Sequence, residues 1–163
     1  MKLQPTEGSV PTYIKYSGSL TRVFKEHCSK FHINQQEQGL FAPHNYYRES
    51  LLMNDLSPLV WARSCLVSRH SATIKTFTTL KQGSLGENLL FTEQQIERSK
   101  YQFYLVSQWD TDLVKLLKNE LLYARLSYFN WDGQSLSLFE LFLPEAHRIL
   151  NQQKVLTKLY QSV

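Results

Sequence analysis

Residues 121–144, LLYARLSYFNWDGQSLSLFELFLP, decide the fold that we expect for this chain. Two runs of aromatic and aliphatic residues flank Asp132-Gly133, and such a pair is the strongest short-range signal for a β-hairpin. In the second strand, residues two positions apart share a face, so Glu140 lies with Leu136, Leu138 and Phe142. A carboxylate on this apolar face is poorly solvated, and it needs a proton, a cation or a ligand beside it.

Outside this hairpin, short apolar or alternating runs predict further strands. They cover residues 30–38, 59–67, 72–80 and 101–107. The threonines and the aromatic of ATIKTFTTL, residues 72–80, suit a pleated sheet. Residues 41–58 are rich in turn formers and aromatics, and we interpret them as irregular.

Four segments have helical patterns. Residues 18–28 form a short helix capped by Ser19, and Ser84 with Glu87 resembles a capping box at the start of a second helix. Residues 111–120 have a helical period behind a threonine cap, and residues 145–160 predict a closing amphipathic helix. The expected buried side of the closing helix consists of Ile149, Val155, Leu156 and Leu159.

About five strands joined mostly by hairpins, with helices between them, predict an α+β protein built on a single antiparallel sheet. The 163 residues fit one domain, residues 1–163, and the hydrophobic content of 42% excludes general disorder. A net charge of +4 without a Lys/Arg run suits small anions at least as well as nucleic acid.

No secretory signal or membrane-length apolar run is present, so we expect a cytoplasmic protein without membrane insertion. Cys28 and Cys65 suit a reducing compartment without disulfides, and the five histidines have no metal-ligand spacing.

Arg63 is the first candidate partner for Glu140. Alternation in LVWARSCLV, residues 59–67, places Arg63 on one face with Trp61 and Cys65. A buried guanidinium needs a carboxylate or phosphate, which its planar fork binds bidentately. The pattern leaves three possibilities open: an Arg63–Glu140 ion pair across the sheet, a solvated face, or a ligand site.

The turn QGSLGENLL, residues 82–90, is the second candidate element. A glycine-flanked turn before a helix exposes backbone N–H groups at the positive end of the helix dipole. The same pattern is common in plain capping turns, and it lacks the lysine of a phosphate-binding loop.

Taken together, GSLTRVF, WARSCLV, SLGENLLF and above all ARLSYFNWDGQSLSLFELFLP resemble the chorismate lyase family, from about Gly18 to Pro144. The resemblance implies an enzyme that converts chorismate to 4-hydroxybenzoate and pyruvate, an early step of ubiquinone biosynthesis, without a cofactor. It also implies a monomer whose site is buried inside an antiparallel sheet under helical flaps.

The resemblance implies a role for each matched residue. Arg63 binds the ring carboxylate with help from the backbone of Leu85, and Glu140 faces the 4-hydroxyl. Leu20 lines the flap side, and Lys75 stands where the family has an arginine for the second carboxylate. Arg63 and Glu140 are therefore the expected catalytic pair.

Arg125 and Tyr123 lie beside the strand of Glu140, and they either support the site or face solvent. For Arg125 we expect the surface. The chain departs from the family pattern in a shorter connection before Gly83 and in an additional helix after Pro144.

Three other functions remain in competition. The first is an effector-binding domain of the same fold, but such domains follow a DNA-binding domain, and fewer than 20 residues precede the resemblance. The second is nucleic-acid binding, for which no basic patch interleaved with aromatics is present. The third is a lyase acting on an isochorismate-type substrate or giving another hydroxybenzoate.

Overall fold

The computed structural model describes residues 1–6, 9–92, 96–108 and 121–161. In order along the chain the elements are β1 (Lys2–Pro5), η1 (Thr12–Lys15), α1 (Leu20–His27), β2 (Phe31–Ala42), β3 (Asn45–Asn54), β4 (Ser57–Val67), α2 (Ser71–Thr78), η2 (Gly86–Leu90), β5 (Gln102–Gln108), β6 (Leu122–Trp131), β7 (Gln134–Phe142), α3 (Pro144–Leu150) and α4 (Gln153–Gln161). None of these helices is long and apolar enough to cross a membrane.

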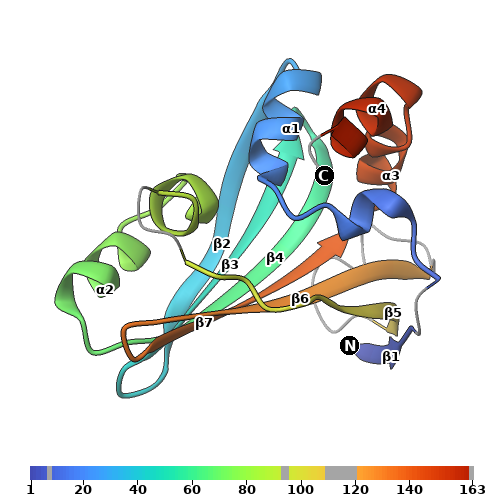
Figure 1. Cartoon of the computed structure of the whole chain (residues 1–163). Coiled ribbons are helices and arrows are strands. Elements are labelled where there is room, and N and C mark those ends of the chain that lie inside the picture. The colour runs from blue at the N-terminus through green and yellow to red at the C-terminus, as the bar shows by residue number, and fades with distance from the viewer. Residues whose placement is uncertain (7–8, 93–95, 109–120, 162–163) are drawn as a thin grey trace.

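The described strands form one antiparallel seven-stranded sheet in the order β1-β5-β6-β7-β4-β3-β2 (Figure 1). This confirms the expected α+β class with a single antiparallel sheet. The Asp132-Gly133 hairpin is confirmed too: Trp131 pairs with Gln134, and both turn residues have positive φ, as a type I′ turn requires. The hairpin places β6 and β7 at the centre of the sheet.

Helices and apolar clusters cover one face of the sheet at two separate places. At one end α1, α3 and α4 pack on Ile33, Leu52, Val60 and Phe142, which we name the first core. At the other end α2 and the η2 segment pack on Leu66, Phe129 and Leu136, the second core. Figure 1 shows α2 and α4 far apart over the sheet. A third cluster, with Trp61 and Leu141, belongs to the opposite face.

Two polar rows cross the sheet between the first and second cores. Strand pairing aligns Ser50, Ala62, Glu140 and Arg125 in one row, and Arg48, Ser64, Leu138 and Ser127 in the next. Because side chains two residues apart share a face, both rows point to the helix-covered side. The fold therefore leaves a polar strip between two apolar cores.

The prediction for residues 72–80 was wrong, because they form helix α2 instead of a strand. Threonine hydroxyls form hydrogen bonds within this helical segment. Those of Thr76, Thr78 and Thr79 donate to backbone carbonyls one turn back. Only Phe77 of this helix is buried, and it enters the second core. The packing of Phe77 in the second core therefore outweighs the β propensity of the threonines in this segment.

The interpretation of residues 41–58 as irregular was also wrong, because most of them form β3. The turn residues cluster at its two ends, where His44 and Asp55 adopt positive φ. Within the strand, Arg48 and Ser50 interrupt the apolar face, which hid the alternation. The sheet therefore contains two strands that the sequence did not predict, β3 and the short β1.

The other helix predictions have mixed outcomes. Ser19 caps α1 as predicted, since its hydroxyl accepts from the N–H of Arg22. The predicted closing helix is two helices, α3 and α4, separated at Asn151 and Gln152. Its expected buried side is confirmed for Ile149, Val155 and Leu159, whereas Leu156 is half-buried. The helix expected at 111–120 lies outside the described residues.

The turn at Gly133 gives a test of the hairpin. Gly133 has φ of 71° and no atom within 4 Å of an added Cβ, so substitution adds backbone strain without a clash. We expect Gly133→Ala to lower the free energy of unfolding by about 1–2 kcal/mol in urea titrations. Gly133→Asn is the matched control, and it should lose less because asparagine tolerates this conformation. Equal losses for the two variants would contradict this account.

Candidate active site

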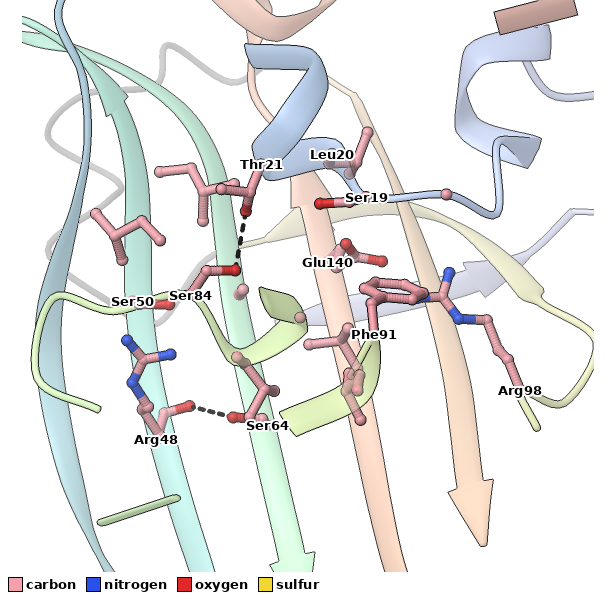
Figure 2. A pocket seen from close by; sticks show the side chains of 18 residues that line it. Ser19, Leu20, Thr21, Arg48, Ser50, Ser64, Ser84, Phe91, Arg98 and Glu140 are labelled. Carbon is pink, nitrogen blue, oxygen red and sulfur yellow. Dashed lines mark hydrogen bonds between the residues drawn. The ribbon is translucent and has the colours of Figure 1, made fainter. Parts of the chain in front are cut away.

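A cavity lies over the polar strip, between the sheet and two roof segments. Its floor comes from β2, β3, β4 and β7, and its roof from the start of α1 and from residues 84–91. The side chains and backbone that line it belong to Gly18, Ser19, Leu20, Thr21, Ile33, Arg48, Ser50, Leu52, Ala62, Ser64, Ser84, Leu85, Gly86, Leu90, Phe91, Arg98, Leu138 and Glu140 (Figure 2). The lining is mostly apolar with a few charged groups, as in small-molecule sites.

Glu140 lies on the floor of this cavity and is buried, but its partner is Arg125. The Nε and Nη2 atoms of Arg125 donate to the two carboxylate oxygens at 2.5 and 3.1 Å. The Arg63–Glu140 ion pair, one of three possibilities that the pattern left open, is therefore not formed. The expected placement of Arg125 at the surface was wrong, since Arg125 is 1% exposed. A bidentate guanidinium leaves part of the acceptor capacity of Glu140 for a ligand.

The remaining nitrogen of Arg125 fixes the chain that precedes α1. Nη1 donates to the backbone oxygens of Ile14 and Tyr16 at 2.9 and 2.5 Å, and the guanidinium lies 4.4 Å from the ring centroid of Tyr101. All three nitrogens of Arg125 are thus engaged. The sequence contained a signal for this pair, because counting outward in equal steps from the Asp132-Gly133 turn brings Arg125 opposite Glu140.

Arg63 lies on the other face of the sheet. Ala62 pairs with Glu140, whereas Arg63 pairs with Phe139, so the side chains of Arg63 and Glu140 point in opposite directions. The Nε of Arg63 lies 3.6 Å from the Oε1 of Glu49, and the guanidinium lies over the rings of Phe41 and Tyr47. It does not line the cavity.

Lys75 is also outside the cavity, on the exposed side of α2. Leu20, the first residue of α1, and Leu85, just before η2, are both buried and line the cavity from the roof. The structure thus brings Leu20, Leu85 and Glu140 together.

Arg48 is a cavity cation that the sequence interpretation missed, because it lies in the stretch expected to be irregular. Its Nη2 donates to the backbone oxygens of Lys81 and Gly83 at 2.9 Å, and its Nε donates to Gln35 at 3.3 Å. These acceptors are all neutral, and burial lowers the pKa of Arg48. Among the described residues, none accepts a hydrogen bond from its Nη1.

Arg98 is the second cation that was missed. It lies ahead of the start of β5 and pairs through the backbone with Phe129 of β6, and its guanidinium reaches the cavity beside Glu140 and Phe91 (Figure 2). Its Nε and Nη1 are buried and have no partner within the described part of the chain. Burial, followed by the charge of Arg125, lowers the pKa of Arg98 to about 10, although Glu140 opposes this shift.

The two roof segments are joined to each other across the cavity. The hydroxyls of Thr21 and Ser84 lie 3.3 Å apart, and Lys25 forms an ion pair with Glu87 at 3.0 Å. The hydroxyl of Ser84 also accepts from the N–H of Glu87, so the predicted capping contact at Ser84 is present. It closes one irregular turn, η2, instead of a regular helix.

Arg48 and Glu140 stand at different places along the cavity floor. They are two strands and one side-chain row apart, which gives roughly 12 Å between their backbone positions for ordinary strand spacing. Both side chains extend into the space between. The site therefore offers a cation at one end, a carboxylate acceptor at the other, and apolar walls of Leu20, Leu85 and Leu138. No three His, Cys, Asp or Glu side chains in the described ranges are grouped as metal ligands.

The sequence of the chain is similar to a known family of proteins. The profile of the chorismate lyase family matches residues 2–155. A probable chorismate pyruvate-lyase of Shewanella amazonensis is 29% identical over 156 residues, covering 86% of this chain and 82% of the relative. The chorismate pyruvate-lyase of Serratia proteamaculans is 24% identical over 155 residues, with 86% and 81% covered. A probable chorismate pyruvate-lyase of Bartonella henselae is 28% identical over 148 residues, with 86% and 85% covered.

The buried pair gives a test of how the site is held. We expect Arg125→Met to lower the free energy of unfolding by about 3–5 kcal/mol, because it leaves Glu140 buried without its cation. The measurement is urea unfolding followed by circular dichroism. Arg63→Met is the matched control and should lose about 1 kcal/mol or less, since its ion pair is partly exposed. Similar small losses in both variants would mean that the Arg125–Glu140 pair does not hold this region.

Proposed function

The chain belongs to the chorismate lyase family, and on that premise we propose that it converts chorismate to 4-hydroxybenzoate and pyruvate. The observation that carries the proposal is the placement of Arg48 and Glu140 at two ends of one largely apolar cavity. Chorismate has a ring carboxylate and, on the opposite side of the ring, a hydroxyl group. A cation and an acceptor in this arrangement suit both groups at once.

In the proposed complex, Arg48 takes the place that the sequence suggested for Arg63. The Nη1 of Arg48 donates to the ring carboxylate, and a backbone N–H at Leu85 assists it, since first-turn N–H groups lack an intrahelical acceptor. Glu140 accepts from the 4-hydroxyl, and Leu20 contacts the ring from the roof. Lys75 has no part in binding.

The reaction requires no electron acceptor. The ether bond between the ring and the enolpyruvyl group breaks, and the ring carbon that bears the hydroxyl loses its hydrogen. The methylene carbon of the leaving group gains a hydrogen, the ether oxygen becomes the ketone of pyruvate, and the ring becomes aromatic. The protein contributes alignment of the substrate and exclusion of water.

Glu140 aligns the hydroxyl in this proposal. Both of its oxygens already accept N–H groups from Arg125, which fixes the carboxylate in one orientation. A fixed acceptor beside the hydroxyl sets the angle at which the neighbouring hydrogen meets the leaving group. The hydrogen then passes directly to the methylene carbon.

We further propose that the protein acts as a cytoplasmic monomer in an early step of ubiquinone biosynthesis, with chorismate and 4-hydroxybenzoate as its partners. Support comes from the anion-suited site and from two free cysteines, Cys28 and Cys65, which fit a reducing compartment.

The direct test is turnover of chorismate by the purified, metal-free protein. We expect 4-hydroxybenzoate and pyruvate in equal amounts, well above an uncatalysed control, because one molecule of each leaves per ether bond broken. Chromatography of both products is the measurement. Tight binding of 4-hydroxybenzoate without turnover would instead identify a ligand-binding domain, and a different hydroxybenzoate would identify a related lyase.

A second test separates Arg48 from Arg63. We expect Arg48→Met to weaken 4-hydroxybenzoate binding by about 2–5 kcal/mol in calorimetric titrations, because the buried carboxylate loses its cation. Arg63→Met should leave the affinity close to that of the unsubstituted protein, since Arg63 points away from the cavity. A larger loss in Arg63→Met than in Arg48→Met would return the carboxylate site to Arg63.

A further inference from the structure

Among the described residues, two cations at the cavity have no carboxylate as an ion-pair partner. The positive groups are Arg48, Arg98 and Arg125, and the negative group is Glu140. Arg125 and Glu140 neutralise each other as a bidentate pair. Among the described residues, no carboxylate forms an ion pair with Arg48 or Arg98. The cavity therefore suits a ligand with two negative charges.

Arg98 is the less satisfied of the two cations. Its guanidinium lies among three aromatic rings, at 4.9 Å from Phe129, 5.1 Å from Tyr101 and 5.5 Å from Phe91. Ring faces attract a cation, but they do not accept its N–H groups as oxygens do. Two buried donor nitrogens of Arg98, Nε and Nη1, have no acceptor among the described residues. Unpaired buried donors lower the stability of the protein. A ligand oxygen that accepts hydrogen bonds from these nitrogens would remove that penalty and bind more tightly.

The position of Arg98 selects which group of the substrate it can meet. Arg48 enters the cavity from β3, whereas Arg98 enters from the side of β5 and β6, next to Glu140 (Figure 2). In chorismate the enolpyruvyl ether is attached to the carbon beside the one that bears the hydroxyl. If Glu140 holds the hydroxyl, the carboxylate of the leaving group lies on this side of the cavity.

We propose that Arg98 binds the carboxylate of the enolpyruvyl leaving group and so distinguishes the dianionic substrate from the monoanionic product. This inference rests on the proposed function. The product 4-hydroxybenzoate retains the groups that meet Arg48 and Glu140 but lacks the second carboxylate. Once pyruvate has left, the donors of Arg98 are open again, which favours exchange of product for new substrate. Negative charge that builds on the departing group also falls beside Arg98.

The test uses two stable aromatic ligands of equal shape. The first is 3-(carboxymethoxy)-4-hydroxybenzoate, a dianion, and the second is 3-(carbamoylmethoxy)-4-hydroxybenzoate, in which a neutral amide replaces the second carboxylate. Calorimetric titration gives the ratio of their affinities. We expect the unsubstituted protein to favour the dianion by about 30-fold or more, and Arg98→Met to remove most of this preference.

Three controls accompany this measurement. Arg63→Met, which removes a partly buried arginine from the other face, should keep the full preference. The affinity of Arg98→Met for 4-hydroxybenzoate should change less than threefold, because the product does not reach Arg98. Arg98→Lys should retain a reduced preference, since an ammonium keeps the charge but loses the fork; it decides the question if the methionine variant does not fold.

The two proposals fail in different ways. If chorismate is not turned over, but the dianion preference exists and depends on Arg98, the lyase proposal fails and the role of Arg98 stands. If chorismate is turned over and Arg98→Met keeps both the preference and kcat/KM, the role of Arg98 fails and the lyase proposal stands. Equal weakening of the dianion and of 4-hydroxybenzoate in Arg98→Met would also overturn the assignment.

Discussion

The ion pair between Arg125 and Glu140 is the interaction on which the site depends. It joins β6 to β7 in the middle of the sheet, and the third nitrogen of Arg125 holds the backbone at Ile14 and Tyr16. The segment that follows Tyr16 leads directly into α1, which forms half of the cavity roof. One guanidinium therefore sets the orientation of the acceptor on the floor and the position of the roof above it.

A buried ion pair of this kind contributes less to stability than its short distances suggest. The free-energy cost of removing two charges from water roughly offsets their mutual attraction. An apolar pair of similar volume is often as stable. What the pair supplies is a fixed carboxylate that still has lone pairs directed to the cavity. The fold does not rely on this pair for its stability. The first and second cores, on either side of the polar strip, bury the apolar surface that holds the sheet and the helices together.

The roof follows from the same division. The α1 segment packs into the first core through Leu20, Val23 and Phe24, while the η2 segment packs into the second core through Leu85 and Leu90. In the described part of the chain, they are joined over the cavity by the Thr21–Ser84 hydrogen bond and the exposed Lys25–Glu87 ion pair. An exposed pair contributes about 1 kcal/mol or less, so Lys25–Glu87 adds little to the attachment of the two halves, and each half is anchored mainly in its own core.

The sequence by itself determined the central hairpin and the anomalous Glu140 on its apolar face, whereas the roof residues Leu20 and Leu85 came from the resemblance to the family. The hairpin and the position of Glu140 follow from local rules: the turn chemistry of Asp132-Gly133 and the two-residue period of a strand. Even the Arg125–Glu140 pair was within reach, because a two-residue turn fixes the register of its own strands. Only the tertiary structure decided that Arg48 and Arg98 enter the cavity and that Arg63 does not. Alternation shows which residues of one strand share a face, but the register between strands distant in sequence decides which of its two faces meets Glu140, and that register is set by packing.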